Sequence, residues 1–135
     1  MTAEGTGGGG GGNIGVFNNE GSSPTMTSVT ATASGGTLNY GVYNWSSSPT
    51  MTDVTATASG GTSFLNGGVV TDGDSSPTIR QSKLSGSGNS LVQSGVGTPK
   101  VALTQLEGPV SRFGGSPPVQ CFNNFDQNLA AVTCP

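Results

Sequence analysis

The chain has 135 residues, of which 31% are hydrophobic and 8% charged, with 24 glycines and a net charge of −3. An ordinary globular domain has about 25% charged residues, so this composition excludes a thick apolar core and favours a thin core with many tight turns. The four Lys and Arg residues form no patch that would neutralise phosphates, which argues against nucleic acid as a partner. No apolar run approaches the ~20 residues that span a bilayer, so no membrane span is predicted.

Residues 1–12 form a Gly-rich leader without the basic and apolar regions of a signal peptide. We therefore expect export by another route, or a chain that is a mature fragment or a virion component. The leader contains a glycine run, which comprises Gly7, Gly8, Gly9, Gly10, Gly11 and Gly12. Such a run is a flexible tether by default, but it also suits an extended segment packed between neighbouring chains, because only glycine allows such close backbone approach.

A repeat follows the leader. The segment 21–37 returns almost unchanged, 25 residues later, at 46–62, and a degenerate third copy begins at Ser75. The block 13–18 likewise recurs at 39–44 and, loosely, at 66–70. A fixed period in this range indicates a solenoid, in which no unit buries its apolar face alone. The alternative of disorder fits less well, because disorder accompanies high net charge or unpatterned low complexity.

Within each copy, apolar and hydroxyl residues alternate, which is typical of short β-strands. Gly-Gly, Ser-Ser-Pro and Asn-Gly pairs mark the corners between strands. Stacking the copies in parallel register about 4.8 Å apart predicts a narrow apolar column inside and threonines outside. The predicted interior holds alanines together with Val16, Val29, Val42, Val54, Val69, Leu84, Met26 and Met51. The predicted exterior presents Thr25, Thr27, Thr30, Thr32, Thr50, Thr52, Thr55 and Thr57.

Asparagines recur at matching positions of the repeats, as Asn13, Asn39 and Asn66 and as Asn18 and Asn44. We expect their amides to hydrogen-bond from rung to rung and to tie the corners together.

The repeats extend over residues 13–106, with 89–106 as a last irregular rung, and 107–135 forms a terminal cap segment. This segment holds the only cysteines, Cys121 and Cys134. A bridge between them would contribute about 3 kcal/mol in the chain-entropy model and implies an oxidising, extracellular compartment. Two thiols without any histidine do not complete a zinc site, and their spacing is not that of a redox CxxC motif.

The repeats at 22–37 and 47–62, with Asn-Tyr-Gly-Val-Tyr-Asn at 39–44, resemble those of bacterial right-handed parallel β-helix repeat proteins. The ending at 104–111, 120–126 and 133–135 is similar to the closing segment of many such proteins. The resemblance covers most of residues 13–135 and implies an all-β, short parallel β-helix of about three to four rungs with a disulfide-bonded C-terminal cap. It implies a secreted or surface location and supplies no catalytic residues.

Catalysis is not expected. The chain has no histidine, and its local charge cluster is Asp72, Asp74, Arg80 and Lys83, with Asp53 one rung away. A glycosidase needs two carboxylates that face a substrate groove, whereas aspartates in a Gly-flanked corner are typical turn formers. The oxygen ligands here are too few for a calcium site, so we predict no metal and no cofactor.

Two features suggest binding. Stacked Thr-x-Thr pairs would form a hydroxyl ladder of the kind seen on ice-binding solenoids, although threonine is also a common strand former. Tyr40, Tyr43 and Trp45 would stack on sugar rings, unless some of these rings lie in the core. Asn44-Trp45-Ser46 also matches a glycosylation sequon.

The N-terminal end of the solenoid has no amphipathic cap, which predicts an uncovered rung that invites another copy. The predicted self-association surface comprises the glycine run with Asn13, Val16 and Phe17. We therefore expect a non-catalytic structural protein that forms a homo-oligomer or filament. The alternative is a glycan-binding adhesin or phage tail-fibre module, and the third hypothesis is ice binding.

Overall fold

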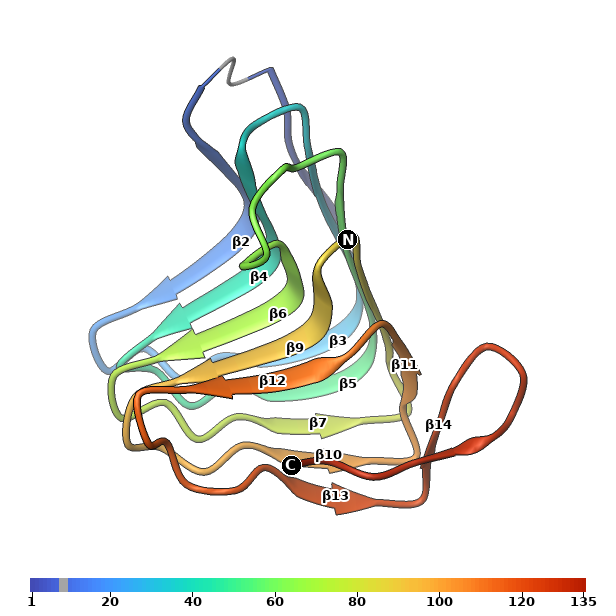
Figure 1. Ribbon diagram of the computed structural model, residues 1–135. Helices are drawn as coiled ribbons and strands as arrows, with labels where there is room; N and C mark the ends of the chain where they lie inside the picture. The colour runs from blue at the N-terminus through green and yellow to red at the C-terminus, as the bar shows by residue number, and fades with distance from the viewer. Residues whose placement is uncertain (8–9) are drawn as a thin grey trace.

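The computed structural model describes residues 1–7 and 10–135, which form two β-sheets wound into a solenoid (Figure 1). The strands in chain order are β1 (Thr2–Gly5), β2 (Gly12–Asn19), β3 (Thr25–Ser34), β4 (Leu38–Trp45), β5 (Thr50–Ser59), β6 (Gly67–Asp72), β7 (Thr78–Arg80), β8 (Lys83–Gly86), β9 (Asn89–Ser94), β10 (Lys100–Ala102), β11 (Gln105–Glu107), β12 (Val110–Phe113), β13 (Gln120–Phe122), β14 (Asn124–Phe125) and β15 (Ala131–Val132). The predicted all-β parallel solenoid is confirmed.

Each turn contributes one strand to a five-stranded sheet, in the order β12-β9-β6-β4-β2, and then crosses a ten-stranded sheet. Four turns, β2–β3, β4–β5, β6–β8 and β9–β11, follow this path. Strands β12, β13 and β14 continue the parallel pairing into the segment 107–135, and β15 closes it by pairing antiparallel with β14. The solenoid therefore extends into the segment that contains the disulfide.

A column of residues with positive φ bends the ten-stranded sheet into two faces. The column comprises Ser28, Asp53, Gln81, Leu103 and Asn123, with φ of 52°, 54°, 48°, 51° and 50°. Non-glycine residues seldom adopt this left-handed conformation, so its recurrence on every turn marks a corner that the stacking maintains. The corner divides β3 and β5 each into two arms, and later turns replace each long strand by two short ones.

The core is a narrow apolar column. In register, Met26 stacks on Met51, Met51 on Ile79 and Ile79 on Val101, and the valine at 42 stacks on the valine at 69. The predicted interior residues from Val29 to Leu84 are buried, which confirms that part of the prediction. Val16, in the first turn, is only partly buried because no complete turn covers it among the described residues.

At the thin edge of this core, the two sheets touch without side chains between them. Gly41 on β4 faces β5 so closely that an added Cβ would lie 2.7 Å from the Thr57 nitrogen and 2.6 Å from the Gly68 oxygen. Real Cβ atoms essentially never approach backbone atoms to this distance. The position therefore requires glycine because of close approach, and the cross-section tapers toward this edge.

Buried asparagines tie the rungs together, as the sequence predicted. The Asn18 Nδ2 donates to Asn44 Oδ1 at 2.8 Å, and the Asn39 backbone nitrogen donates to Asn66 Oδ1 at 2.6 Å. The Asn39 amide also donates to the carbonyls of Gly36 and Ser59, at 3.1 Å and 2.9 Å. The Asn39 bonds satisfy buried backbone groups, as buried polar groups require, whereas the Asn18–Asn44 bond joins two side chains.

Ser-Ser-Pro corners repeat the same bonding at each level. The proline carbonyl accepts a hydrogen bond from the next turn, from Thr50 to Pro24 and from Thr78 to Pro49, both at 3.0 Å. The second serine hydroxyl accepts from the nitrogen of its counterpart, Ser48, at 3.2 Å. Residues 22–24 and 47–49 are thus equivalent in structure as well as in sequence.

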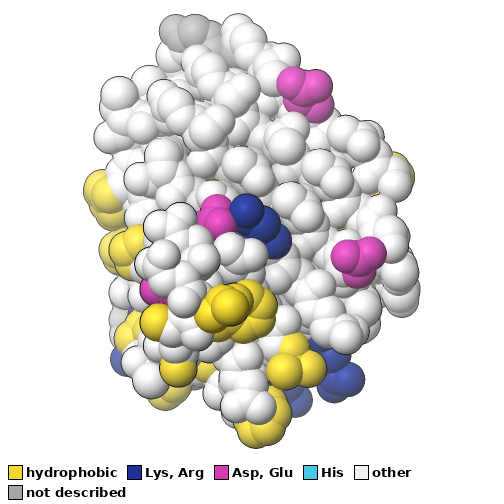
Figure 2. Space-filling model, turned by 90° about the vertical axis from the view of Figure 1, so that its right-hand side faces the viewer, with side chains coloured by type: hydrophobic (Ala, Val, Ile, Leu, Met, Phe, Trp, Pro, Cys, Tyr) yellow, Lys and Arg dark blue, Asp and Glu magenta, His cyan; other side chains and the backbone are white. Residues whose placement is uncertain are grey.

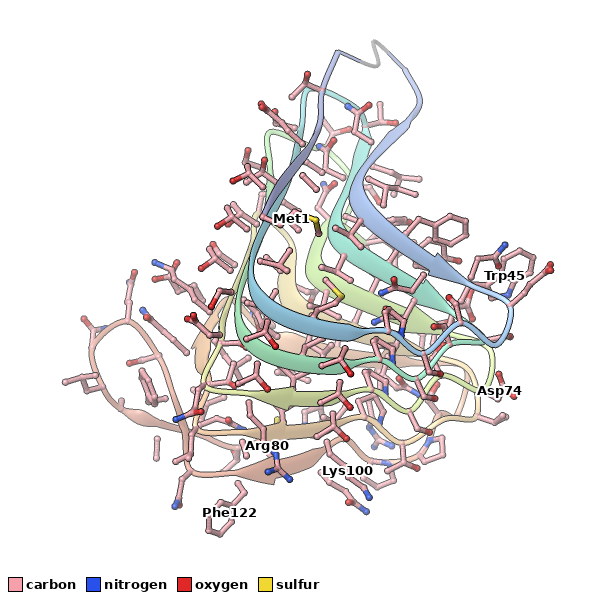
Figure 3. The ribbon with its side chains drawn as sticks, turned by 180° about the vertical axis from the view of Figure 1, so that it is seen from behind. Met1, Trp45, Asp74, Arg80, Lys100 and Phe122 are labelled. Carbon is pink, nitrogen blue, oxygen red and sulfur yellow. A yellow bond between two sulfur atoms is a disulfide. The ribbon has the colours of Figure 1, made fainter. Side chains whose placement is uncertain are left out.

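The two ends of the solenoid differ. At the N-terminal end, β1 covers only the second arm of β3, and Met1 lies over the opening (Figure 3). At the C-terminal end, the Cys121–Cys134 disulfide, with Cα atoms 5.9 Å apart, fastens the last residues to β13. The predicted bridge is therefore present, and it ties down the last residues of the chain at the C-terminal end.

Candidate functional site

The outer surface of the five-stranded sheet carries a cluster of aromatic and apolar side chains. Tyr40, Tyr43 and Trp45 are partly or largely exposed on β4 between buried neighbours and therefore face outward. On the next two turns the register places Val70 and then Val92 beside Tyr43. Both valines are buried, with 6% and 1% of their surface exposed, although neither belongs to the core cluster. Side chains from elsewhere in the chain must therefore cover them.

The covering side chains are Phe64, in the loop before β6, and Phe113, at the end of β12. Their rings lie 5.8 Å apart with an interplanar angle of 52°. Together with Tyr40 and Tyr43 they form the walls of a cavity of about 300 Å³, whose floor includes Val70 and Val92. We call this cavity the aromatic groove.

The two tyrosine rings of the groove pack against each other and against a ring of the preceding turn. The Tyr40 and Tyr43 rings lie 5.2 Å apart and tilted by 48°, and the Phe17 ring of the preceding turn lies 5.2 Å from Tyr43 and nearly parallel to it, at 11°. These distances are those of favourable aromatic pairs. The stack holds the tyrosines at fixed positions and leaves part of each ring accessible.

One charged residue lines the groove among the described residues. Asp72, at the end of β6, accepts hydrogen bonds from the Gly73 nitrogen at 2.7 Å and from the Tyr43 hydroxyl at 3.4 Å. Burial, followed by the negative charge of Asp72, raises the pKa of Tyr40 above its ordinary value of 10.0. The same two causes, with smaller contributions from Tyr40 and from the hydrogen bond to Asp72, raise the pKa of Tyr43. The groove is therefore apolar in its walls and electronegative at Asp72.

The predicted aromatic set is only partly brought together. Tyr40 and Tyr43 line the groove, whereas Trp45 is not among its lining residues. Figure 3 shows Trp45 at the corner where β4 ends, pointing away from the body of the solenoid, and 44% of its surface is exposed. Trp45 therefore does not contribute to the groove.

The sequon at Asn44, a motif short enough to occur by chance, is not accessible in the folded protein. The Asn44 side chain points inward, has 0% of its surface exposed and accepts a hydrogen bond from Asn18. An oligosaccharide needs an accessible amide nitrogen, so this asparagine serves the interior ladder.

Sequence reasoning missed Phe64, Phe113 and Asp72 as site residues. A signal for Phe64 was present: Gly-Thr-Leu-Asn at 36–39 becomes Gly-Thr-Ser-Phe-Leu-Asn at 61–66, an insertion of two residues within the repeat. Insertions into solenoid repeats form loops on one face, often the binding face. Phe113 carried no comparable signal, because it lies in the segment predicted as a cap.

The predicted threonine ladder is divided by the corner at Ser28 and Asp53. One arm carries Thr25 and Thr27 in register with Thr50 and Thr52, and the other carries Thr30, Thr32, Thr55 and Thr57. On the third turn the first arm continues as Thr78 and Arg80, and the second as Lys83 and Ser85. Each hydroxyl surface is therefore small: Arg80 ends the first arm, and Lys83 and Glu4 bound the second. Figure 2 shows that the ten-stranded side is mostly uncharged and polar, with apolar side chains gathered toward one end.

The predicted self-association residues lie at the N-terminal end. Asn13, Val16 and Phe17 belong to β2, which pairs only with β4 among the described residues. Val16 lines a depression of about 350 Å³ with Met26, Val29 and Met1. Gly12 begins β2, whereas Gly8 and Gly9 lie outside the described residues. The glycine run is therefore not described as a whole.

The predicted charge cluster is dispersed. Lys83 forms an ion pair with Glu107 at 2.9 Å, and Asp53 accepts a hydrogen bond from the Ser28 hydroxyl at 2.7 Å. Across residues 1–7 and 10–135, no three acidic, histidine or cysteine side chains gather in a way that would hold a metal ion. The same residues contain no helix long and apolar enough to cross a membrane.

No protein-family model, curated protein or solved structure matches this chain. Of what the resemblance to bacterial β-helix repeat proteins implies, the structure shows the parallel β-solenoid, with about four turns.

Proposed function

We propose that the protein is a non-catalytic, extracellular glycan-binding module whose ligand occupies the aromatic groove. The observation that carries the proposal is the groove itself, in which aromatic rings from distant parts of the chain surround a cavity of about 300 Å³. This volume lies at the lower end of the range for small-ligand sites, about 300–1,000 Å³. The disulfide supports an extracellular or cell-surface location, because such bonds persist in oxidising compartments.

The chemistry of the groove suits a saccharide. The C–H faces of a sugar ring pack on aromatic rings, while its hydroxyls need hydrogen-bonding partners at the edge of the contact. Tyr43 supplies both a ring and a hydroxyl, and Asp72 and Ser94 supply further polar groups. Backbone ladders on both sides hold the strands that carry these residues, so the site is preorganised and little conformational entropy is lost on binding.

A glycan array, followed by calorimetry on the strongest ligand, tests this proposal. Phe113→Ala removes one wall and should weaken binding about 2- to 12-fold, because an aromatic contact contributes about 0.5–1.5 kcal/mol. The matched control is Phe122→Ala, which removes an equally large ring that is 65% exposed and does not line the groove. Circular dichroism verifies that both variants fold. If no glycan binds, or if Phe113→Ala binds as well as the parent, the proposal fails.

A second candidate function is self-association as a structural subunit, which is supported by the incomplete cover of the N-terminal end, where β1 pairs with only one arm of β3. The outer edge of β2 presents unpaired backbone groups beside the depression lined by Val16 and Met26, and such edges pair readily with another chain. A second copy bound there would bury both features. Pairing between the N-terminal ends of two copies, related by a two-fold axis, would yield a closed dimer.

Light scattering over a range of concentrations tests this second candidate. Val16→Lys places a charge in the depression and should convert dimers to monomers. Thr62→Lys, at an exposed position outside the depression, is the control and should leave the mass unchanged. A parent protein that stays monomeric at every concentration would exclude self-association through this edge.

A further inference from the structure

We infer that the aromatic groove selects a cationic saccharide, a sugar unit with a free ammonium group, over its neutral N-acylated counterpart. This inference rests on the proposed glycan-binding function and names its ligand class. It follows from the charge of the groove lining, from the unused bonding capacity of Asp72 and from the four rings that surround the cavity.

Asp72 is the only charged group lining the groove among the described residues. The only ion pair that those residues form joins Lys83 to Glu107, so Asp72 has no cationic partner there. Arg112 lies on β12, two strands from β6, but it does not line the groove, and its guanidinium donates to the Ser116 carbonyl at 2.6 Å. A ligand cation in the groove would therefore meet an uncompensated carboxylate.

Asp72 has accepting capacity that its contacts within the protein do not use. A carboxylate has about four lone-pair sites, and Asp72 uses its Oδ1 for the Gly73 nitrogen and its Oδ2 for the long bond from Tyr43. At least half of its accepting capacity is thus available to an ammonium group, which carries three donors. The Tyr43 hydroxyl, at 3.4 Å, lies at the limit of a hydrogen bond and is easily displaced.

The aromatic rings of the groove also favour a cation. Cations are attracted to the faces of aromatic rings within about 6 Å of the centroid, and desolvation strengthens this attraction. Tyr40, Tyr43, Phe64 and Phe113 surround the same cavity as Asp72. Aromatic faces combined with one carboxylate favour an organic cation over a neutral group of the same size. The net charge of −3 also favours the approach of a cation over long range.

The experiment compares two oligosaccharides of equal length, a tetramer of β-1,4-linked glucosamine and its fully N-acetylated form, by isothermal titration calorimetry. We expect the glucosamine tetramer to bind the parent protein about 5- to 10-fold more tightly, and this preference should shrink as salt is added. Asp72→Asn keeps an acceptor for the Gly73 nitrogen and should bring the two affinities together, chiefly by weakening the glucosamine tetramer.

The control is Asp74→Asn, which removes the same unit of charge from an exposed residue that does not line the groove and should retain the preference. Equal affinities of the parent protein for the two tetramers, or a preference that survives Asp72→Asn, would overturn the inference while leaving glycan binding intact. If neither tetramer binds but another glycan on the array does, the inference is likewise overturned. If no glycan binds at all, the proposed function itself fails.

Discussion

Tyr40 and Tyr43 are the only tyrosines in the chain, and both lie in the aromatic groove. Any tyrosine signal from the protein therefore reports on this one site. Their shared surroundings also couple them to Asp72, since a phenolate formed here would lie in an apolar wall beside a carboxylate. Burial and the negative charge of Asp72 both favour the neutral phenol.

We predict that both tyrosines ionise above the ordinary value of 10.0 in an ultraviolet absorbance titration, because burial and then the charge of Asp72 raise each pKa. Their folded-state pKa values exceed those of the unfolded chain. The resulting contribution to stability is thus fully present below pH 10 and is lost as the pH rises through the folded-state pKa values. Asp72→Asn should lower both midpoints. Midpoints at the ordinary value in the parent protein would contradict the described environment.

At the scale of strands, the sequence predicted the repeated elements well and the groove poorly. Thr25 to Ser34 and Thr50 to Ser59 are nearly identical, and identical residues stack in register, so their pattern alone indicates strands, interior and corners. The groove instead depends on Phe64, from an insertion, and Phe113, from a segment outside the repeat. Only the winding of the chain brings these rings together. A repeat in the sequence reveals only residues that recur from copy to copy, and Phe64 and Phe113 do not recur.

The close contact between β4 and β5 provides a test at the same scale. Gly41→Ala adds a Cβ within 3 Å of backbone atoms that cannot move without disturbing both sheets, so we expect a loss of about 2–3 kcal/mol in urea denaturation. Gly12→Ala is the matched control, because its Cβ would meet its nearest atom at 3.6 Å, an ordinary contact. Equal stability of the two variants would show that the sheets do not approach as closely as described.

For the whole molecule, the relevant distinction is between middle turns and end turns. In a solenoid each turn contacts only its neighbours, so the same side chain contributes differently according to its level. Met26 and Met51 are equivalent in the repeat, but Met51 has stacked partners on both sides, Met26 and Ile79. Met26 instead borders the depression at the N-terminal end.

We predict that Met51→Ala lowers the free energy of unfolding by about 2–5 kcal/mol, the usual cost of a cavity in a closed core. Met26→Ala should cost at most about half as much, because solvent and Met1 can occupy the vacated space. Urea denaturation of the two variants side by side makes the comparison. Equal losses would mean that the N-terminal end is as tightly closed as the middle.

The equivalence of the two Ser-Ser-Pro corners has a genetic consequence. Excision of residues 25–49 joins Pro24 to Thr50 and recreates the sequence Ser-Ser-Pro-Thr-Met-Thr, so the junction is indistinguishable from the original corner. Recombination between the two copies would therefore remove or add one complete turn and leave the amino-acid sequence at the junction unchanged. The excised turn carries both tyrosines, so one such event would leave a shorter chain of the same fold without the groove. An additional copy would instead extend the row of outward-facing rings by one turn, so the number of copies would set the length of that row.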